Sequence, residues 1–264
     1  MIDSFGREIK SLRVSITDKC NLHCGYCKPP SWIGSGPHLL SYEQIEDVVR
    51  AAVGMGVRKV RITGGEPLLR RNVEILVRML ACIDGIEDLA MSTNGILLEK
   101  HAETLADAGL HRVNVSLDSI DPDRFRSITG GGDLNRVLAG IAAARKAGLE
   151  PIKLNCVYTD SSDEPDALGV ARLAEENGLE ARFIQQMDFP SGKFAVVEGG
   201  SGGDCRRCDR LRLSCDGQIR PCLFSDMSFS VSELGGMRAL EEAIRAKPEM
   251  GASCSQSWIR VTGG

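Results

Sequence analysis

Three cysteines lie close together near the start of the chain, in the run Thr17-Asp-Lys-Cys20-Asn-Leu-His-Cys24-Gly-Tyr-Cys27. Thiolates this closely spaced can bind three irons of a cubane cluster and leave the fourth iron without a protein ligand. An open position is what a catalytic metal needs, whereas a structural metal is closed by four ligands. His23 would supply a fourth ligand for zinc, but the Cys-x3-Cys-x2-Cys spacing is unusual for zinc. The run therefore predicts a catalytic iron–sulfur cluster.

A second group of cysteines lies near the end of the chain. Cys205, Cys208 and Cys222 form a Cys-x2-Cys-x13-Cys pattern, with Cys215 between the last two. Four thiolates would close a zinc site, and three would bind a second cubane with an open iron. The spacing alone leaves both alternatives open. The remaining cysteines stand alone and are expected to be ordinary core or surface residues: Cys82, Cys156 and Cys254.

Arginines are dense around the second group, although the chain carries a net charge of −4. They are Arg206, Arg207, Arg210, Arg212 and Arg220. Guanidinium groups bind phosphate through paired hydrogen bonds, but a run of charge is more often a solvated surface. Other cations occur inside apolar strand patterns, where an unpaired charge is costly to bury; these are Arg13, Lys59, Arg61 and Lys153. Together they predict a polyanionic ligand inside the fold.

The elements that must position these residues alternate between strand and helix patterns. Strands are expected over 12–16, 59–63, 88–91, 112–117, 152–157 and 181–186, with helices after them. Ser41 and Gln44 predict a capping box at the start of the first helix. Six βα units without a hairpin signal predict a parallel sheet, either curved as a partial barrel or flat and doubly wound.

The pattern breaks after Met187. Residues 188–203 are rich in Gly and Ser and are expected to form a linker or a mobile loop. We therefore predict a barrel domain over residues 1–187 and a small C-terminal module over residues 188–264.

The carboxyl ends of parallel strands meet on one face, where barrel enzymes place their active sites. The second strand there runs into Gly64-Gly65-Glu66-Pro67. Glycine allows a close approach of the backbone to a ligand, and a carboxylate can accept a hydrogen bond from an ammonium group.

The cysteine spacing, Tyr26 before the third cysteine and the GGEP run one unit later resemble the radical S-adenosylmethionine (SAM) family. Over nearly its whole length the chain is similar to the GTP 3′,8-cyclases of molybdenum-cofactor biosynthesis. The resemblance implies a partial (β/α)6 TIM-type barrel with a C-terminal Fe–S module, two [4Fe–4S] clusters and SAM as cofactors. It further implies that a 5′-deoxyadenosyl radical abstracts the ribose 3′-hydrogen of GTP, and that the ribose carbon then bonds to C8 of guanine to give 3′,8-cyclo-7,8-dihydro-GTP.

The resemblance also implies roles for individual residues. Cys20, Cys24 and Cys27 would hold the SAM cluster, and Cys205, Cys208 and Cys222 an auxiliary cluster whose open iron takes the guanine base. SAM would contact Tyr26, Gly64, Gly65, Glu66, Ser116 and Met187. GTP would contact Arg13, Lys59, Arg61, Ser92, Lys153, Arg182, Arg210, Leu211 and Arg212. Arg210, Arg212 and the terminal Gly263-Gly264 would act at the catalytic centre.

Three departures from the family pattern leave alternatives open. Gln185 and Gln186 stand where the family usually has an acidic–aromatic pair before Met187. The segment from Met187 to Cys205 is shorter than is typical, so the strands that support the second cluster are in question. Cys215 stands where the family has no cysteine, and a fourth thiolate would block coordination of a substrate. The alternative reading is a related radical SAM enzyme that acts on another nucleotide or on a peptide.

The composition of the chain bears on where the protein is located and which partners it binds. The chain has 264 residues, 42% of them hydrophobic, and no apolar run approaches a membrane span. Residues 1–7 lack the apolar stretch of a secretory signal, so we expect a cytoplasmic protein. The negative net charge argues against binding to nucleic acid. The expected partners are GTP and an electron donor such as a flavodoxin or ferredoxin, and a homodimer is left open.

Overall fold

The computed structural model describes residues 1–27 and 39–254. In this part of the chain, nine strands form one sheet in the order β6-β5-β4-β3-β2-β1-β7-β8-β9. The strands are β1 (Ser11–Ser15), β2 (Lys59–Thr63), β3 (Asp88–Thr93), β4 (Arg112–Ser116), β5 (Lys153–Tyr158), β6 (Glu180–Gln185), β7 (Arg210–Leu213), β8 (Gln218–Arg220) and β9 (Phe229–Ser230). Neighbouring strands from β6 to β7 in this order pair in parallel, whereas β7 with β8 and β8 with β9 pair antiparallel.

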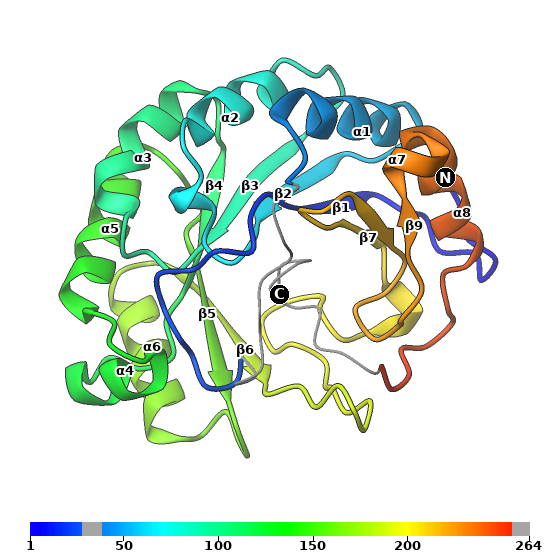
Figure 1. The fold of residues 1–264 in the computed structure, drawn as a ribbon. Coiled ribbons are helices and arrows are strands. Elements are labelled where there is room, and N and C mark those ends of the chain that lie inside the picture. The colour runs from blue at the N-terminus through cyan, green and yellow to red at the C-terminus, as the bar shows by residue number, and fades with distance from the viewer. Residues whose placement is uncertain (28–38, 255–264) are drawn as a thin grey trace.

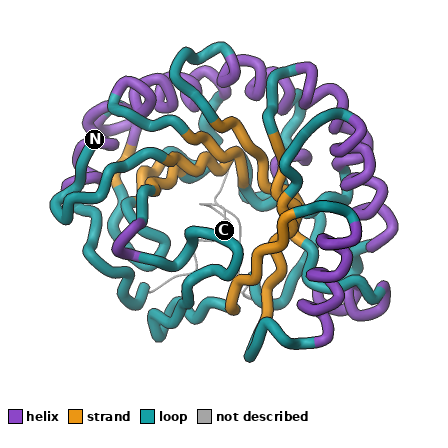
Figure 2. The backbone as a smooth tube through the Cα atoms, turned by 180° about the vertical axis from the view of Figure 1, so that it is seen from behind, coloured by secondary structure: helices purple, strands orange, loops and turns teal. Residues whose placement is uncertain are grey.

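The helices cover the outer face of a curved sheet, so the barrel form is the correct one of the two predicted (Figure 1). They are α1 (Tyr42–Gly54), α2 (Val73–Ala81), α3 (Leu98–Asp107), α4 (Pro122–Thr129), α5 (Leu134–Lys146), α6 (Pro165–Glu176), α7 (Val231–Leu234) and α8 (Gly236–Arg245). Viewed from behind, the strands line the inside of the ring and the helices its rim (Figure 2). No helix in the described ranges is long and apolar enough to cross a bilayer.

Alternation along the strands separates an apolar outer face from a polar inner face. Leu12 and Val14 of β1 are fully buried in the core formed with the helices, whereas Arg13 between them faces the opposite way. In β2 the same alternation places Val60 and Ile62 in the core and Arg61 on the opposite face of the strand. The cations that looked misplaced inside apolar strands therefore share one surface, the inner face of the barrel.

The predicted elements are confirmed to within a few residues, and the capping box of Ser41 and Gln44 is present. Helix α4 was not predicted. Its first turn has a good start signal, because the Asp121 side chain accepts a hydrogen bond from the Arg124 amide and Pro122 is the first helical residue. The helix buries only Phe125 and Thr129, so its apolar pattern is too sparse to stand out.

The C-terminal part continues the barrel sheet. Strand β7 pairs with β1 in parallel, with Arg13 opposite Arg212, and α8 packs against α1. Strands for the second cysteine group are thus present despite the short segment before them. The domain boundary after residue 187 stays a prediction from the sequence.

Residues 188–203 do not form a free linker. The Glu198 backbone bridges to Phe183 of β6, and a Cβ on Gly199 would lie 2.4 Å from the Ala181 carbonyl oxygen. The segment is therefore held along the outer edge of β6, where the parallel part of the sheet ends.

Candidate active site

The loop after β1 brings the first three cysteines to the carboxyl end of the barrel and is fastened to the GGEP run. The Gly65 amide donates to the Thr17 carbonyl at 2.7 Å, and the Glu66 amide donates to the Lys19 carbonyl at 2.7 Å. A Cβ on Gly65 would lie only 2.4 Å from the Lys19 carbonyl oxygen. Glycine at this position is therefore required by the approach of the cysteine loop itself.

The thiols of this loop suit an iron–sulfur cluster. The Cys20 sulfur accepts hydrogen bonds from the Leu22 amide at 3.4 Å and from Asn94 Nδ2 at 3.8 Å. Burial raises the pKa of the Cys24 thiol to about 12, with added repulsion from Asp118 and the other two cysteines. Bound iron would offset that repulsion and stabilise the thiolates.

The donors to these thiols also suit a cluster. Soft thiolate ligands with amide donors to sulfur are typical of iron–sulfur clusters. Within the described ranges, no group of three His, Cys, Asp or Glu side chains is arranged to bind one metal ion. The preference for a cluster over zinc rests on the spacing of the cysteines.

Tyr26 and Asp118 join the cysteine loop to β4 and β5. The Tyr26 hydroxyl donates to Asp118 Oδ2 at 2.7 Å, and Asp118 Oδ1 accepts from the Val157 amide at 2.9 Å. Burial raises the pKa of Tyr26 well above its usual value, and the Asp118 charge raises it further. Asp118 was not among the predicted site residues, although it follows Ser116 at the end of β4.

Glu66 is fully buried behind the same loop. Its Oε1 accepts from Thr93 Oγ1 at 2.8 Å and from the Leu68 amide at 3.1 Å, and its Oε2 accepts from the Asn94 amide at 2.7 Å. Burial raises the pKa of Glu66 to about 7, and these three donors oppose the rise. Glu66 thus locks the loops after β2 and β3 together, and its contact with SAM stays a prediction.

An arginine row crosses the inner face of the barrel. Arg13 of β1 lies in register with Arg61 of β2 on one side and with Arg212 of β7 on the other. Beyond Ala90 of β3, the next strand places Arg112 in the same row. We call Arg212, Arg13, Arg61 and Arg112 the arginine row.

In the arginine row, a carboxylate pairs with Arg112, and like charges act on Arg13, Arg61 and Arg212. Arg112 forms a paired contact with Asp88, with Nε 2.8 Å from Oδ1 and Nη2 2.5 Å from Oδ2. Burial, together with the charges of Arg112, Arg182 and Arg210, lowers the pKa of Arg61 to about 9. Burial and the Arg210 charge lower the pKa of Arg212 to about 10. Like charges at these positions repel one another, and a bound polyanion would reverse that effect.

Two donors in this region have no hydrogen-bond acceptor among the described residues: the buried Nε atoms of Arg61 and Arg182. An unsatisfied buried donor costs about 1–3 kcal/mol. Phosphate oxygens accept several hydrogen bonds from guanidinium groups. The residues present therefore fit a ligand with more than one phosphate.

The other predicted GTP contacts are spread over the same face. Asn114 Nδ2 donates to Ser92 Oγ at 3.3 Å, and Lys153 is paired with Glu180. Lys59 is exposed at the start of β2. The Leu211 side chain lies on the outer face of β7 against Ile9 and Leu240, so only its backbone faces the interior.

The second cysteine group lies beside β7. Cys208 and Cys222 are near each other and near Lys247. Burial acts to raise the pKa of Cys208, but the Lys247 charge and contacts with Arg210 outweigh it and lower the pKa. Burial prevails at Cys222 and raises its pKa.

Cys215 faces a different part of the molecule. It is fully buried, its carbonyl accepts from the Leu40 amide at 3.0 Å, and its thiol lies near the Arg70 guanidinium. The three-thiolate site at Cys205, Cys208 and Cys222 stays a prediction.

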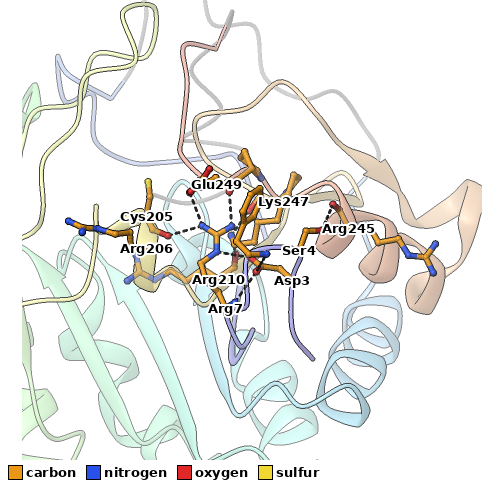
Figure 3. Close-up of polar contacts among 12 residues, drawn as sticks. Asp3, Ser4, Arg7, Cys205, Arg206, Arg210, Arg245, Lys247 and Glu249 are labelled. Atoms are coloured by element: carbon orange, nitrogen blue, oxygen red, sulfur yellow. Dashed lines mark hydrogen bonds and ion pairs between the residues drawn. The ribbon is translucent and has the colours of Figure 1, made fainter.

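Arg7 ties the chain's beginning to this site (Figure 3). Its Nη1 donates to the Cys205 carbonyl at 2.7 Å and to the Glu249 carbonyl at 2.9 Å, and its Nη2 donates to the Pro248 carbonyl at 2.7 Å. Its Nε lies 2.6 Å from Asp3 Oδ2, and both side chains are buried. We call this set of contacts the Arg7 clamp.

Two predicted site residues lie outside the described part of the chain, Gly263 and Gly264. Met187 packs near Cys222 against a small apolar cluster that contains Phe189 and Phe224. Ser116 is half-buried at the end of β4. Their proposed contacts with ligands stay predictions.

The fold and the cysteine loop define the class of protein. Residues 14–174 match the model of the radical SAM superfamily, which is more than half of the chain. SuiB of Streptococcus suis bound to S-adenosylmethionine has a similar fold, with a TM-score of 0.67, 16% identity, and coverage of 92% of this chain and 64% of that one. The structure of anSMEcpe with bound AdoMet gives a TM-score of 0.64 at 15% identity over 96% and 88% of the two chains.

Curated relatives place the chain more narrowly. The GTP 3′,8-cyclase of Alkaliphilus oremlandii is 37% identical, over 94% of this chain and 93% of the relative. That of Moorella thermoacetica is 40% identical, over 90% and 88%. The chain therefore belongs to the radical SAM superfamily and, within it, to the GTP 3′,8-cyclase family. It is an enzyme whose cofactors are SAM and [4Fe–4S] clusters.

Proposed function

We propose that the protein converts GTP to 3′,8-cyclo-7,8-dihydro-GTP, the first step of molybdenum-cofactor biosynthesis. The observation that carries this proposal is the arginine row, which lies between the two cysteine groups on the inner face of the barrel. The relatives that share nearly the full length of the chain are named for this reaction. When bound, the first cluster and SAM supply the 5′-deoxyadenosyl radical.

The chain's own residues would hold both ends of the nucleotide. Arg13, Arg61 and Arg212 would bind the triphosphate, because they lie in register on neighbouring strands and other arginines lower the pKa of each. Cys205, Cys208 and Cys222 would carry the second cluster next to β7, where its open iron would take the guanine base. A nucleotide fixed at both ends has its ribose and base held in one arrangement, which favours bond formation between them.

The buried interior would also keep water from the reactive groups. Tyr26 and Asp118 would fix the cysteine loop over the barrel through their 2.7 Å hydrogen bond. Glu66 would hold the neighbouring loops in place through donors from Thr93 and Asn94. SAM would lie against Tyr26, Gly64, Gly65, Glu66, Ser116 and Met187. These residues position SAM and exclude solvent.

The same proposal implies a cellular location and an electron donor. We place the enzyme in the cytoplasm, with a flavodoxin or ferredoxin as electron donor, and we leave a homodimer open. A reaction on a peptide is the alternative from the sequence. The arginine row argues against it, because a neutral or cationic peptide would not offset the repulsion among these like charges.

The proposal is tested by isotope transfer. Reconstituted protein is incubated without oxygen with SAM, dithionite and GTP carrying deuterium at the 3′ carbon. We expect deuterium in the 5′-deoxyadenosine that is released. A parallel panel of ATP, CTP and UTP should give far less 5′-deoxyadenosine. Formation of 5′-deoxyadenosine without deuterium, or equal amounts with every nucleotide, would reject GTP cyclisation.

A further inference from the structure

Lys247 is a buried cation with no role in the proposed function as described so far. Its side chain follows the end of α8, and the residue is only 3% exposed. Its Nζ donates to the Arg210 carbonyl at 2.7 Å and to the Pro221 carbonyl at 2.8 Å. Within the described ranges no carboxylate forms an ion pair with it.

The two carbonyls that Lys247 binds flank the second cysteine group. Arg210 lies two residues after Cys208, and Pro221 directly precedes Cys222. The ammonium group also lies next to the Cys208 thiol and near the Cys222 thiol. Lys247 therefore bridges the two backbone segments that carry these cysteines and places a positive charge near both thiols.

A buried ammonium group is costly unless an anion balances it. Carbonyl oxygens supply hydrogen bonds but no net charge. The thiolates of Cys208 and Cys222 are the nearest groups that can carry a negative charge, and a cubane held by three thiolates adds a further negative charge on reduction. The burial of Lys247 is explained if the second cluster is its counter-charge.

Other cations approach the same thiols but face the substrate side. Arg210 and Arg212 project from β7 into the barrel, where the phosphates of GTP would neutralise them. Lys247 belongs to a different element: it follows the end of α8, lies near the Arg7 clamp, and contacts the backbone of Arg210 rather than its side chain (Figure 3).

We propose that Lys247 is a positioning residue of the auxiliary cluster that stabilises its reduced state. This inference rests on the proposed function, because it assumes a cluster at Cys205, Cys208 and Cys222. A positive charge beside a cluster favours the form with the extra electron and so raises the reduction potential. Through Pro221 and Arg210, Lys247 also holds the two cysteine segments at a fixed separation.

The test is a redox titration of the holoenzyme, followed by electron paramagnetic resonance with dithionite as reductant. SAM is added, because it alters the signal of the cluster to which it binds and so separates the two signals. Lys247→Gln retains amide donors for the carbonyls but removes the charge. We expect this variant to shift the auxiliary cluster to a more negative potential and to leave the SAM cluster unchanged.

Two further variants distinguish an effect of the Lys247 charge from a purely structural effect of its hydrogen bonds. Arg245→Gln removes a cation two residues away whose side chain is 72% exposed, and it should leave both potentials unchanged. Lys247→Arg keeps the charge and should keep a potential close to that of the wild type. An unshifted potential in Lys247→Gln, or an equal shift in Lys247→Arg, would overturn the inference.

Iron content resolves the remaining outcomes. Loss of the auxiliary cluster in Lys247→Gln but not in Lys247→Arg would support the need for charge. Loss in both variants would overturn it and leave Lys247 as a structural bridge only. A wild-type protein with iron for a single cluster would refute the second cluster of the proposed function itself, which distinguishes that failure from a failure of this inference.

Discussion

Burial acts in opposite directions on the two kinds of ionisable side chain that meet inside the barrel. It raises the pKa of Cys24 and Glu66, and it lowers the pKa of Arg61 and Arg212. In each case the charged form is disfavoured in the protein alone. Iron at the thiols and phosphate at the guanidinium groups would each remove that penalty, so the interior is organised for ligands of specific charge.

Arg61→Met should separate stability from binding. The substitution removes a repelled, buried cation, so we expect the free energy of unfolding of the metal-free protein to rise by about 1–4 kcal/mol. We expect affinity for GTP to fall by about tenfold to a hundredfold, because one charge-assisted contact is lost. Urea unfolding and equilibrium dialysis measure the two effects. Arg136→Met, at an exposed position of α5, should change neither, and unchanged GTP affinity in Arg61→Met would contradict the prediction.

Glu66 should make stability depend on pH. Its pKa is raised to about 7 in the folded chain, from an ordinary value of 4.5. The folded state therefore binds this proton more tightly, so the contribution is favourable at low pH and is lost as the pH rises toward 7. The loss amounts to about 3 kcal/mol at most. Glu66→Gln should remove this pH-dependent part of the unfolding free energy, which urea unfolding at several pH values between 5 and 8 measures. An identical pH dependence in the variant and the wild type would disprove the prediction.

Cys215 and Cys222 should respond differently to substitution. The Cys215 thiol lies near the Arg70 guanidinium, and we propose three other thiols as ligands of the second cluster, so Cys215→Ala should keep iron for both clusters. Cys222→Ala should lose about half of the iron. Iron analysis and electron paramagnetic resonance of the reconstituted proteins measure both. Equal iron loss in the two variants would show that Cys215 is a ligand.

At the scale of elements, the Arg7 clamp joins three segments that are distant in sequence. Arg7→Lys keeps the charge but cannot form the forked contacts with the carbonyls of Cys205, Pro248 and Glu249. We expect a loss of about 1–3 kcal/mol in unfolding free energy, because buried carbonyls lose their hydrogen-bond donors. Hydrogen exchange of residues 205–209 should accelerate in the variant. Arg245→Lys, on the exposed side of α8, is the control, and unchanged exchange in Arg7→Lys would contradict the clamp.

Elements with a strong local pattern were predictable from the sequence. The strand Lys59–Thr63 was predicted with its observed bounds, because β-branched residues alternate with cations and glycines follow. Pairing between β1 and β7 was not predictable, because nothing local fixes the register of strands separated by most of the chain. Arg212 could therefore be assigned to the phosphate site only by resemblance.

Within the site, the residues expected to bind cofactors or substrate could be predicted from the sequence, but the residues that pair with them could not. The cysteines have a spacing that carries chemical meaning, and the cations stood out against apolar strands. Asp88 and Arg112 neutralise each other only because β3 and β4 are adjacent. Lys247 carries no signal of its own, since one lysine after a helix is ordinary. Such partners depend on the tertiary structure.

For the molecule as a whole, the arginine row predicts that phosphate stabilises the metal-free fold. Inorganic tripolyphosphate should bind without the base or ribose. At a concentration 100 times its Kd it should add about 2.7 kcal/mol to the unfolding free energy. Thermal unfolding with tripolyphosphate, and with sulfate at matched ionic strength as control, measures this effect. An equal gain in Arg61→Met would place the binding outside the arginine row.

The position of β7 beside β1 has a consequence for biosynthesis. Strand β1 leaves the ribosome well before its partner β7, which follows only after the whole (β/α) series. At ordinary rates of translation, roughly 10 to 40 seconds separate them. During that interval β7 is not there to pair with one edge of β1, and the arginine row lacks Arg212. The nascent protein therefore has its complete arginine row only after β7 has been synthesised.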